Sequence, residues 1–465
     1  MHLRIAISTG ALLLLAACGG GEGQPAAEAV RAQAAPVPTA DTSWAQPWAA
    51  AAPAPAQAVN TSPWVTGYYA GWFWDQMYPP ERVDMSAMTH FVFGRVAPGG
   101  GSLGGTAGTI VEGAGTAHHT GLSPDGRRSV EDYLIARAHR AGARALLMLG
   151  GDGADGLGFV RSTADDIRPT FVRNIVDYLV RHRYDGVDVD WENELHGTPQ
   201  LGVSAAEARR RLKALLVEVR AEANRRLRFR APNPPVLVTF PGYAVSINFL
   251  QPGGKVEQWQ ADVAHLVDQY NLMSYGIGTA YNGGGWDSWF SGPIFGATGT
   301  TPYDLKTSID AYVRTGVPRR KLGIGIGFYG IYYGPGITGP RQPTEGNAVF
   351  EYSDAALGYS ELVRKGYLSH GAYRWDAVAK ATFRSYPNGG YVPANDPGAA
   401  PAGFLSYEDE RSIAAKGQWV RNAGLGGTIL WTINYGYLPA KRTNPLLSAV
   451  KASFLGAEAE RRPLE

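Results

Sequence analysis

The sequence predicts an α/β fold built on a parallel sheet that helices cover on its outer side. Segment 184–192 alternates acidic and apolar residues, as a strand does. Apolar residues recur at helical spacing before it, in 171–179, and after it, in 205–227. A strand between two such helices is typical of a parallel α/β sheet, in which inward side chains at the carboxyl end of a strand line a site.

Three acidic side chains on one face of that strand favour a chemical role. Same-face neighbours in a strand are roughly 6.6 Å apart, so Asp188, Asp190 and Glu192 form a row opposite Val187 and Val189. Asp is depleted from strands, and an unpaired carboxylate that loses its water costs several kcal/mol. The structural alternative is an acidic face open to water, but the flanking helices argue against it.

Residues 1–18 are typical of an export signal. Arg4 supplies a positive charge, and residues 5–17 form an apolar run too short to span a membrane comfortably. Leu-Ala-Ala-Cys at 15–18 resembles a bacterial lipobox, which would make Cys18 the lipidated first residue of the mature protein; an ordinary signal peptide is the alternative. Both predict an exported protein, lipid-anchored to a bacterial membrane or secreted. Cys18 is the only cysteine, so no disulfide forms within the chain.

Residues 19–62 predict a disordered tether. They are rich in Ala, Pro, Gly and Gln and hold little to bury beyond Trp44 and Trp48. The 465 residues suffice for one barrel of about 250 residues with insertions. A formal net charge of +2 with scattered Lys and Arg argues against nucleic acid as a partner.

The pattern Asp185-Gly186-x-Asp188-x-Asp190-x-Glu192 resembles the active-site signature of glycoside hydrolase family 18, the chitinases and their relatives. Seven further segments are similar to the family's other barrel strands, in the family's order: 67–72, 89–93, 145–151, 236–243, 270–275, 321–330 and 426–431. The resemblance, to bacterial chitinases in particular, implies a (β/α)8 TIM barrel as the catalytic domain over 63–455, followed by a tail at 456–465.

The interval 333–424 is too long for a simple connection between the seventh and eighth strands. It resembles the small α+β insertion domain of many chitinases. Such an insertion would wall one side of the cleft and favour a deep groove for several sugars.

Hydrolysis of a glycosidic bond needs an acid for the departing oxygen and a negative group for the oxocarbenium-like transition state. Glu192, at the carboxyl end of its strand, is the candidate acid. Asp188, Asp190 and Glu192 lie close enough to share at least one proton. Their spacing alone also permits Asp190 to act as a direct nucleophile.

The resemblance implies a substrate-assisted reaction, in which the acetamido carbonyl of the substrate attacks its own anomeric carbon. Asp190 would orient the acetamido group, Asp188 would hold Asp190, and Glu192 would act first as acid and then as base. Tyr275 matches the tyrosine that hydrogen-bonds the acetamido oxygen. The sugar before the cut must then carry an N-acetyl group.

Several aromatic and apolar residues are candidates for sugar binding, with ordinary core packing as the alternative for each. Trp431 matches the family's tryptophan beneath the distorted sugar, and Met273 and Phe93 resemble residues near the floor of the site. Further candidates lie in the first-strand motif and along the expected groove: Tyr69, Trp72, Trp74, Trp286, Trp289 and Trp375.

Two departures from the family pattern have consequences. Met148 stands where the third strand usually carries a serine that bonds the aspartates, so we expect Asp185 or Asp188 to find another partner and the working pH of the acid to differ. Ile331 follows Phe328-Tyr329-Gly330 where many relatives have arginine, which puts an extended-substrate contact in doubt.

The expected activity is hydrolysis of β-1,4 bonds next to N-acetylglucosamine in chitin or its oligosaccharides, with endo action favoured over exo action, by a monomer without metal or cofactor. The absence of a separate binding module favours oligomers over crystalline chitin. His118 and His119, adjacent in a Gly-rich loop, suit a solvated turn better than a metal site. The alternatives are an endo-β-N-acetylglucosaminidase or peptidoglycan hydrolase of the same family, and a non-catalytic chitin-binding lectin, which the intact Glu192 disfavours.

Overall fold

The computed structural model describes residues 60–112, 121–244, 256–279, 286–344, 349–351, 354–389 and 400–456. The expected signal, nearly all of the expected tether, His118, His119 and the tail from 457 lie outside the described residues.

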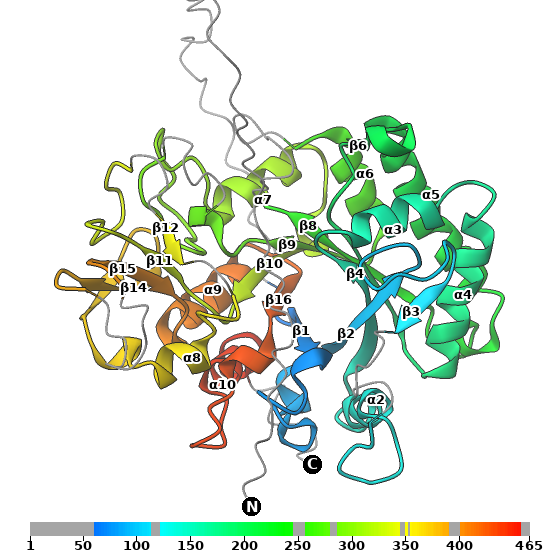
Figure 1. Cartoon of the computed structure of the whole chain (residues 1–465), viewed down its shortest axis with the longest axis horizontal. Helices are drawn as coiled ribbons and strands as arrows, with labels where there is room; N and C mark the ends of the chain where they lie inside the picture. Colours follow the sequence, from blue (N-terminus) through cyan, green and yellow to red (C-terminus); the bar gives the residue numbers. More distant parts are fainter. Residues whose placement is uncertain are drawn as a thin grey trace, which may run out of the picture. The chain divides into compact units, whose positions relative to one another are not determined.

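Parallel strands form a closed barrel (Figure 1). Each strand is hydrogen-bonded to the next, and the last pairs with the first to close the ring. In chain order the barrel strands are β1 (Trp64–Ala70), β2 (His90–Pro98), β4 (Arg144–Gly151), β5 (Gly186–Trp191), β8 (Leu237–Tyr243), β9 (Gln269–Met273), β10 (Leu322–Gly327) and β16 (Gly427–Trp431). Antiparallel β3 (Ile110–Glu112) extends β2. The TIM barrel predicted from the sequence is confirmed.

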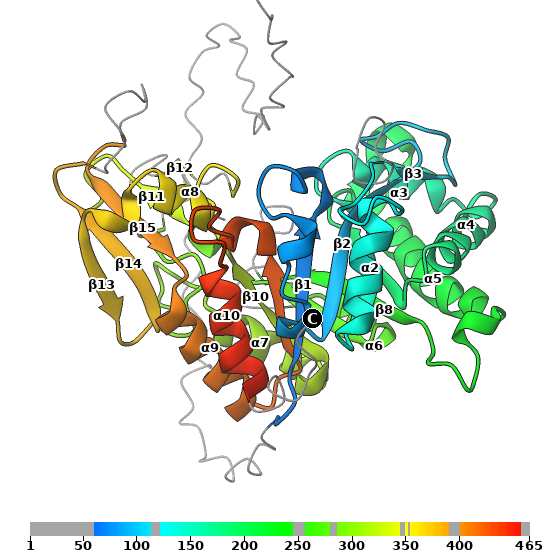
Figure 2. The same cartoon turned by 90° about the horizontal axis from the view of Figure 1, so that it is seen from below.

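Helices surround the barrel on its outer face (Figures 1 and 2). They are α2 (Val130–Arg140), α3 (Asp155–Ser162), α4 (Arg168–Arg181), α5 (Ala205–Ala223), α6 (Gln258–Leu266), α7 (Leu305–Arg314), α9 (Glu410–Asn422) and α10 (Pro445–Val450). The helical spacing read in 171–179 falls within α4, and that read in 205–227 overlaps α5, which ends at Ala223; the apolar faces of both helices are buried. No helix within the described ranges is both long and apolar enough to cross a membrane.

The strands bury apolar side chains on both faces. A large cluster fills the layer between strands and helices, including Val187 and Val189 of β5. A smaller cluster lies inside the barrel and contains Tyr68, Val92, Leu146, Met148 and Ile429. Because successive strand residues alternate between these two layers, the register of each strand decides which side chains can reach the site.

A five-stranded sheet lies between β10 and β16 in the chain, where the sequence analysis expects an insertion at 333–424. Its hydrogen-bonded order is β12 (Val349–Glu351), β11 (Ile331–Tyr333), β15 (Gly403–Tyr407), β14 (Ala381–Tyr386) and β13 (Ala372–Asp376). Helix α8 (Tyr359–Arg364) belongs to the same segment. Both views show this sheet to one side of the barrel (Figures 1 and 2).

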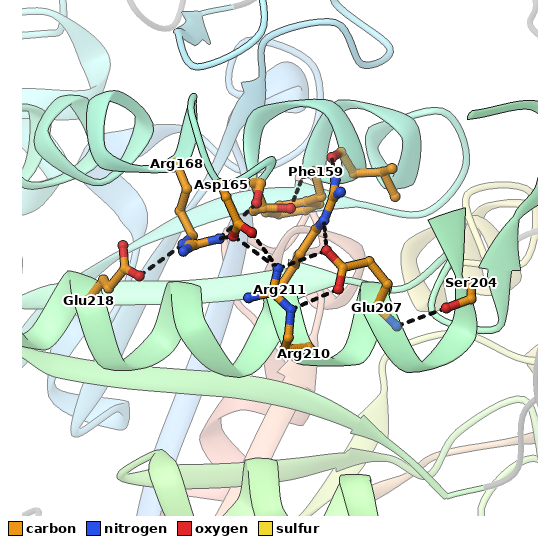
Figure 3. A network of polar contacts seen from close by, with 10 residues as sticks. Phe159, Asp165, Arg168, Ser204, Glu207, Arg210, Arg211 and Glu218 are labelled. Carbon is orange, nitrogen blue, oxygen red and sulfur yellow. Dashed lines mark hydrogen bonds and ion pairs between the residues drawn. The ribbon is translucent and has the colours of Figure 1, made fainter. Parts of the chain in front are cut away.

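Two ion-pair systems differ sharply in burial. Lys416 of α9 is fully buried and donates to both carboxylate oxygens of Glu408 at 2.6 and 2.8 Å. In contrast, Arg210 of α5 pairs with Glu207 and Asp165 on the exposed side of α4 and α5 (Figure 3). Water and salt screen the second system but not the first.

We therefore expect Lys416→Met to destabilise the protein by about 3–5 kcal/mol, because it leaves the Glu408 charge buried without its partner. Arg210→Met, the exposed control, should change the unfolding free energy little. Chemical denaturation of both variants measures the difference. Equal losses in the two variants would contradict this assignment.

Candidate active site

The carboxylates of β5 lie where the barrel opens. Asp188 and Asp190 are buried and point into the barrel, while Glu192 follows the last residue of the strand and is half-buried. This arrangement follows from the alternation read in the sequence: the valines face the helices, and the acids face the interior.

Contacts on both sides fix the end of β5. The Trp191 ring is buried and stacked on Phe159, with centroids 4.9 Å apart, and its Nε1 donates to the carbonyl of Asn193 at 2.7 Å. The Tyr243 hydroxyl donates to the carbonyl of Glu192. The backbone of Glu192 is thus held while its side chain lines the pocket.

Asp188 accepts one hydrogen bond on each oxygen. Tyr68 donates from its hydroxyl to Oδ2 at 2.6 Å, and Thr239 donates from Oγ1 to Oδ1. Burial raises the pKa of Asp188 to about 6, although both donors oppose the shift. The expectation that Met148 obliges Asp188 to find another partner agrees with these contacts. Met148 itself packs inside the barrel in the cluster that contains Tyr68.

Asp190 and Glu192 behave as one titrating pair. Burial and the charges of Glu192 and Asp188 raise the pKa of Asp190 well above its usual value. Burial and the charge of Asp152 raise the pKa of Glu192 to about 8, opposed by a side-chain hydrogen bond with Asp190. A hydrogen bond between two carboxyl groups needs a proton, so the pair holds one at neutral pH.

A pocket of about 590 Å³, including its open mouth, lies over these groups. Its walls carry four carboxyl groups together with apolar and aromatic side chains: Asp152, Asp190, Glu192, Asp354, Tyr68, Pro241, Met273, Tyr275 and Trp431. Within the described part of the chain, Oδ1 of Asp190 is buried and accepts no hydrogen bond. A buried acceptor of this kind suits a donor on a bound ligand.

Tyr275 reaches the pocket from the segment that follows β9, and Trp431 from the end of β16. A side chain at Gly325 of β10 would meet the Tyr275 ring at 2.7 Å, so glycine there leaves space for the tyrosine. Trp431 lies 5.7 Å from the Tyr68 ring, and its Nε1 donates to Oδ2 of Asp354 at 2.6 Å. The indole is therefore fixed in orientation at the edge of the pocket.

The model of the family described as glycosyl hydrolases family 18 matches residues 65–436. The chain belongs to glycosyl hydrolase family 18. The match spans both the barrel strands and the pocket described above.

Curated relatives and solved structures agree with this assignment. The chain is 23% identical over 407 residues to probable chitinase 10 of Drosophila melanogaster, covering 84% of this chain and 16% of that protein. It is 23% identical over 288 residues to chitinase A1 of Niallia circulans, covering 57% and 37%. The chain thus spans well under half the length of both relatives.

Two solved structures share the fold. The Group IV chitinase of Ostrinia furnacalis in complex with allosamidin has a TM-score of 0.63 at 20% identity, covering 86% of this chain and all of that one. A mutant Class V chitinase of Nicotiana tobaccum in complex with NAG4 has a TM-score of 0.61 at 17% identity, covering 84% and 99%.

Within this family 18 barrel, two residues proposed for sugar binding face away from the pocket. Tyr69 is fully buried between strands and helices, its hydroxyl donates to the carbonyl of Tyr78 at 2.6 Å, and its ring stacks on Phe93. Phe93 is equally buried in that outer layer. The placement of Tyr69 and Phe93 at the site was wrong by one residue of register, because Tyr68 and Val92 hold the inward positions.

The tryptophan candidates differ in their surroundings. Trp72 is half-buried with its ring 6.4 Å from that of Trp431, which places it next to the pocket. Trp286 packs against Tyr303. Trp289 is fully buried and donates to the Tyr303 carbonyl, as a core residue does. Trp375, on β13, lies under the Arg411 guanidinium at 4.2 Å. Sugar stacking on Trp72, Trp74, Trp286 and Trp375 stays a prediction.

Other residues of the sequence motifs lie outside the pocket. Asp185 sits at the amino end of β5, where it accepts from His139 Nε2, the Ala145 N–H and Arg228. Burial opposes the shift, but these bonds hold the pKa of Asp185 below its usual value. Asp185 therefore joins neighbouring elements and does not reach substrate. Ile331 is buried in β11.

Three polar residues of the pocket, Tyr68, Asp152 and Asp354, were not singled out from the sequence. Thr239, which donates to Asp188, was not singled out either. Tyr68 was inside a quoted motif, and strand alternation with a known register would have identified it. Asp354 is 77 residues from its partner Trp431 in the chain, and no local pattern links them. No group of three or more His, Cys, Asp or Glu side chains in the described ranges is placed to hold a metal ion.

The raised pKa of Glu192 predicts an alkaline limit to activity. An acid must be protonated to act, so kcat should fall about tenfold per pH unit above pH 8, where the Asp190–Glu192 pair loses its shared proton.

Met148→Ser would place a hydrogen-bond donor beside ionised Asp188. The donor should lower the pKa of Asp188, about 6 in the parent, and shift the acidic limb of the profile to lower pH. The dependence of kcat on pH, measured for the parent and for Met148→Ser on a chitin oligomer, shows both the acidic and the alkaline limb. Identical profiles would refute the expectation that Met148 in place of serine changes the working pH.

Proposed function

We propose that the chain hydrolyses β-1,4 bonds next to N-acetylglucosamine in chitin or chitin oligosaccharides, with retention of configuration and with the acetamido group of the substrate as nucleophile. The observation that carries this proposal is the pairing of Glu192, which holds a proton at neutral pH, with Asp190, whose buried Oδ1 has no partner among the described residues. One group can donate a proton, and the other can accept from an amide N–H.

The pocket supplies a group for each step of this reaction. Glu192 protonates the leaving oxygen. Asp190 accepts from the acetamido N–H and stabilises the oxazolinium ion as its positive charge forms. Tyr275 donates to the acetamido oxygen, and Trp431 supports the distorted sugar. Glu192 then takes a proton from the attacking water, which returns the pair to its starting state.

The surrounding contacts support the roles of the aspartates. Tyr68 and Thr239 saturate Asp188 and hold it as a fixed, buried neighbour of Asp190. Its charge is one cause of the raised pKa of Asp190.

A panel of three substrates tests this function against its alternatives. The purified chain is incubated with a β-1,4-linked N-acetylglucosamine hexamer, an N-glycan with an intact core, and peptidoglycan, and products are identified by mass spectrometry. Shorter oligomers from the hexamer support the proposal. Cleavage of only the N-glycan or peptidoglycan would refute it in favour of a different family 18 hydrolase, and saturable hexamer binding without cleavage would favour a lectin.

We also propose that the protein is exported and anchored by a lipid on Cys18, supported by the lipobox-like residues 15–18. Two fatty chains hold a protein on a membrane far more firmly than one. When expressed in a bacterium, the parent should sediment with membranes, and Cys18→Ser should move to the soluble fraction. Equal partition of the two would contradict the lipid anchor.

A further inference from the structure

The pocket is more acidic than the proposed reaction requires. Asp190 and Glu192 carry out the chemistry, yet Asp152 and Asp354 line the same space. None of the residues that line the pocket is basic. The nearby guanidinium of Arg95 is paired with the buried Asp155, so its charge is already compensated. Bound substrate therefore meets an excess of negative charge.

Asp152 is the carboxylate in this group without an assigned task. It follows directly on β4, and its side chain is exposed and makes no hydrogen bond or ion pair with the part of the chain that the structure describes. By contrast, Asp354 accepts from Trp431. The turn that carries Asp152 is fixed, because the Gly153 N–H donates to Oδ1 of Asn193 at 2.6 Å.

This contact places Asp152 beside Glu192, on the side of the site away from Tyr275 and Trp431. Asn193 is the residue after Glu192, and β4 is the neighbour of β5. Tyr275, by contrast, follows β9, and Trp431 ends β16. The charge of Asp152 is the largest electrostatic influence of a neighbour on Glu192 and the smallest of those on Asp190. Glu192 protonates the leaving oxygen, so Asp152 faces the sugar that leaves.

The buried acceptor of Asp190 indicates which sugar binds before the scissile bond. The buried Oδ1 of Asp190 has no protein donor among the described residues and lines the pocket, so it suits the amide N–H of an acetylated sugar. The Asp152 carboxylate, which is exposed and has no partner among the described residues, suits a positively charged group. The two sites thus favour different substituents at carbon 2 of successive sugars.

We propose that Asp152 makes the enzyme prefer a glucosamine unit, with a free protonated amine, immediately after the scissile bond. The preferred substrate is then partly N-deacetylated chitin, cut between an N-acetylglucosamine and a glucosamine. This inference rests on the proposed function, since the acetylated sugar before the cut is the one that reacts.

The test compares cleavage sites on a partly deacetylated chitin chain by the full-length protein, its Asp152→Asn variant and the control Asp166→Asn, whose carboxylate lies before α4 and outside the pocket. The new non-reducing ends are identified by NMR as glucosamine or N-acetylglucosamine. The parent and Asp166→Asn should produce glucosamine ends about fivefold more often than random cleavage would, the size expected of one exposed ion pair. Asp152→Asn should lose this excess.

The dependence of the cleavage preference on salt and pH tests the same inference independently. The glucosamine excess should shrink in 1 M salt and disappear when the amine is deprotonated, while cleavage of the fully acetylated hexamer continues. Random ends from the parent, or an Asp152→Asn variant that shifts the pH profile equally on all substrates without changing the ends, would overturn the inference while leaving the proposed function intact. Failure to cleave any acetylated oligomer would instead overturn the proposed function.

Discussion

Glu192→Gln should lower kcat on N-acetylglucosamine oligomers by about 10²–10⁴-fold, because the amide cannot give a proton to the leaving oxygen. Binding should persist, since glutamine has the size and shape of the protonated acid. Reducing-end assays measure the rate, and calorimetry with the hexamer measures the affinity. A low rate with unchanged affinity shows that the variant has lost the acid but still binds the hexamer.

The chain offers a matched control two residues away. Glu194 lies outside the pocket lining and accepts from Thr198 at 2.7 Å, a bond that Glu194→Gln can keep. The kcat of Glu194→Gln should stay near that of the parent. A Glu192→Gln variant with more than a tenth of the parent's kcat would show that another group supplies the proton.

Stability gives a check that Glu192→Gln is folded. The folded pKa of Glu192, about 8, lies above its unfolded value, so the native state binds the proton more tightly. Between about pH 4.5 and 8 the unfolded chain releases this proton while the folded protein keeps it, so the stability of the parent falls as pH rises through this window. Gln cannot ionise, so the variant should melt no lower than the parent at pH 6 and higher at pH 9.

Asp190→Asn should lower kcat by about 10²–10³-fold, since it removes the charge that stabilises the oxazolinium ion. It should also move the alkaline limb of the pH profile to lower pH. Asparagine carries no proton to share, and its N–H stabilises the ionised form of Glu192, whose pKa then falls. The rate and the limb are both read from kcat against pH.

The shift of the alkaline limb in Asp190→Asn distinguishes a titrating partner of Glu192 from a side chain that only fills space. Asp185→Asn is the control, because Asp185 lies at the opposite end of β5 and has no contact with the pair. The alkaline limb of that variant should not move. An unchanged limb in Asp190→Asn would mean that Asp190 and Glu192 titrate independently.

The sequence was most informative where polarity and strand alternation coincide. In 184–192 the acids alternate with valines, and this alternation predicted the strand, its face and the candidate chemistry, while the helical spacing on both sides predicted the fold class. In β1 and β2 both faces are apolar and both are buried, and alternation then carries no information on which face is inward. Tyr69 and Phe93 were misplaced for that reason.

Contacts between distant segments lay beyond the reach of sequence patterns. Thr239 and Tyr68 meet at Asp188 from separate strands, and Asp354 reaches Trp431 from the segment between β10 and β16. Each contact depends on barrel closure and loop path, which no local spacing encodes. Asp152 was missed because one exposed aspartate after a Gly-Gly pair has no distinguishing pattern.

In the proposed reaction the acetamido group of the substrate is the nucleophile and Glu192 is the acid. Proton NMR of hexamer hydrolysis by the purified chain, followed from the first minutes, tests both assignments. Products should appear first as the β anomer and then equilibrate, and hexamers with N-acetyl groups removed throughout should not be cut. Initial release of the α anomer, or cleavage of the fully deacetylated hexamer, would contradict the proposed reaction.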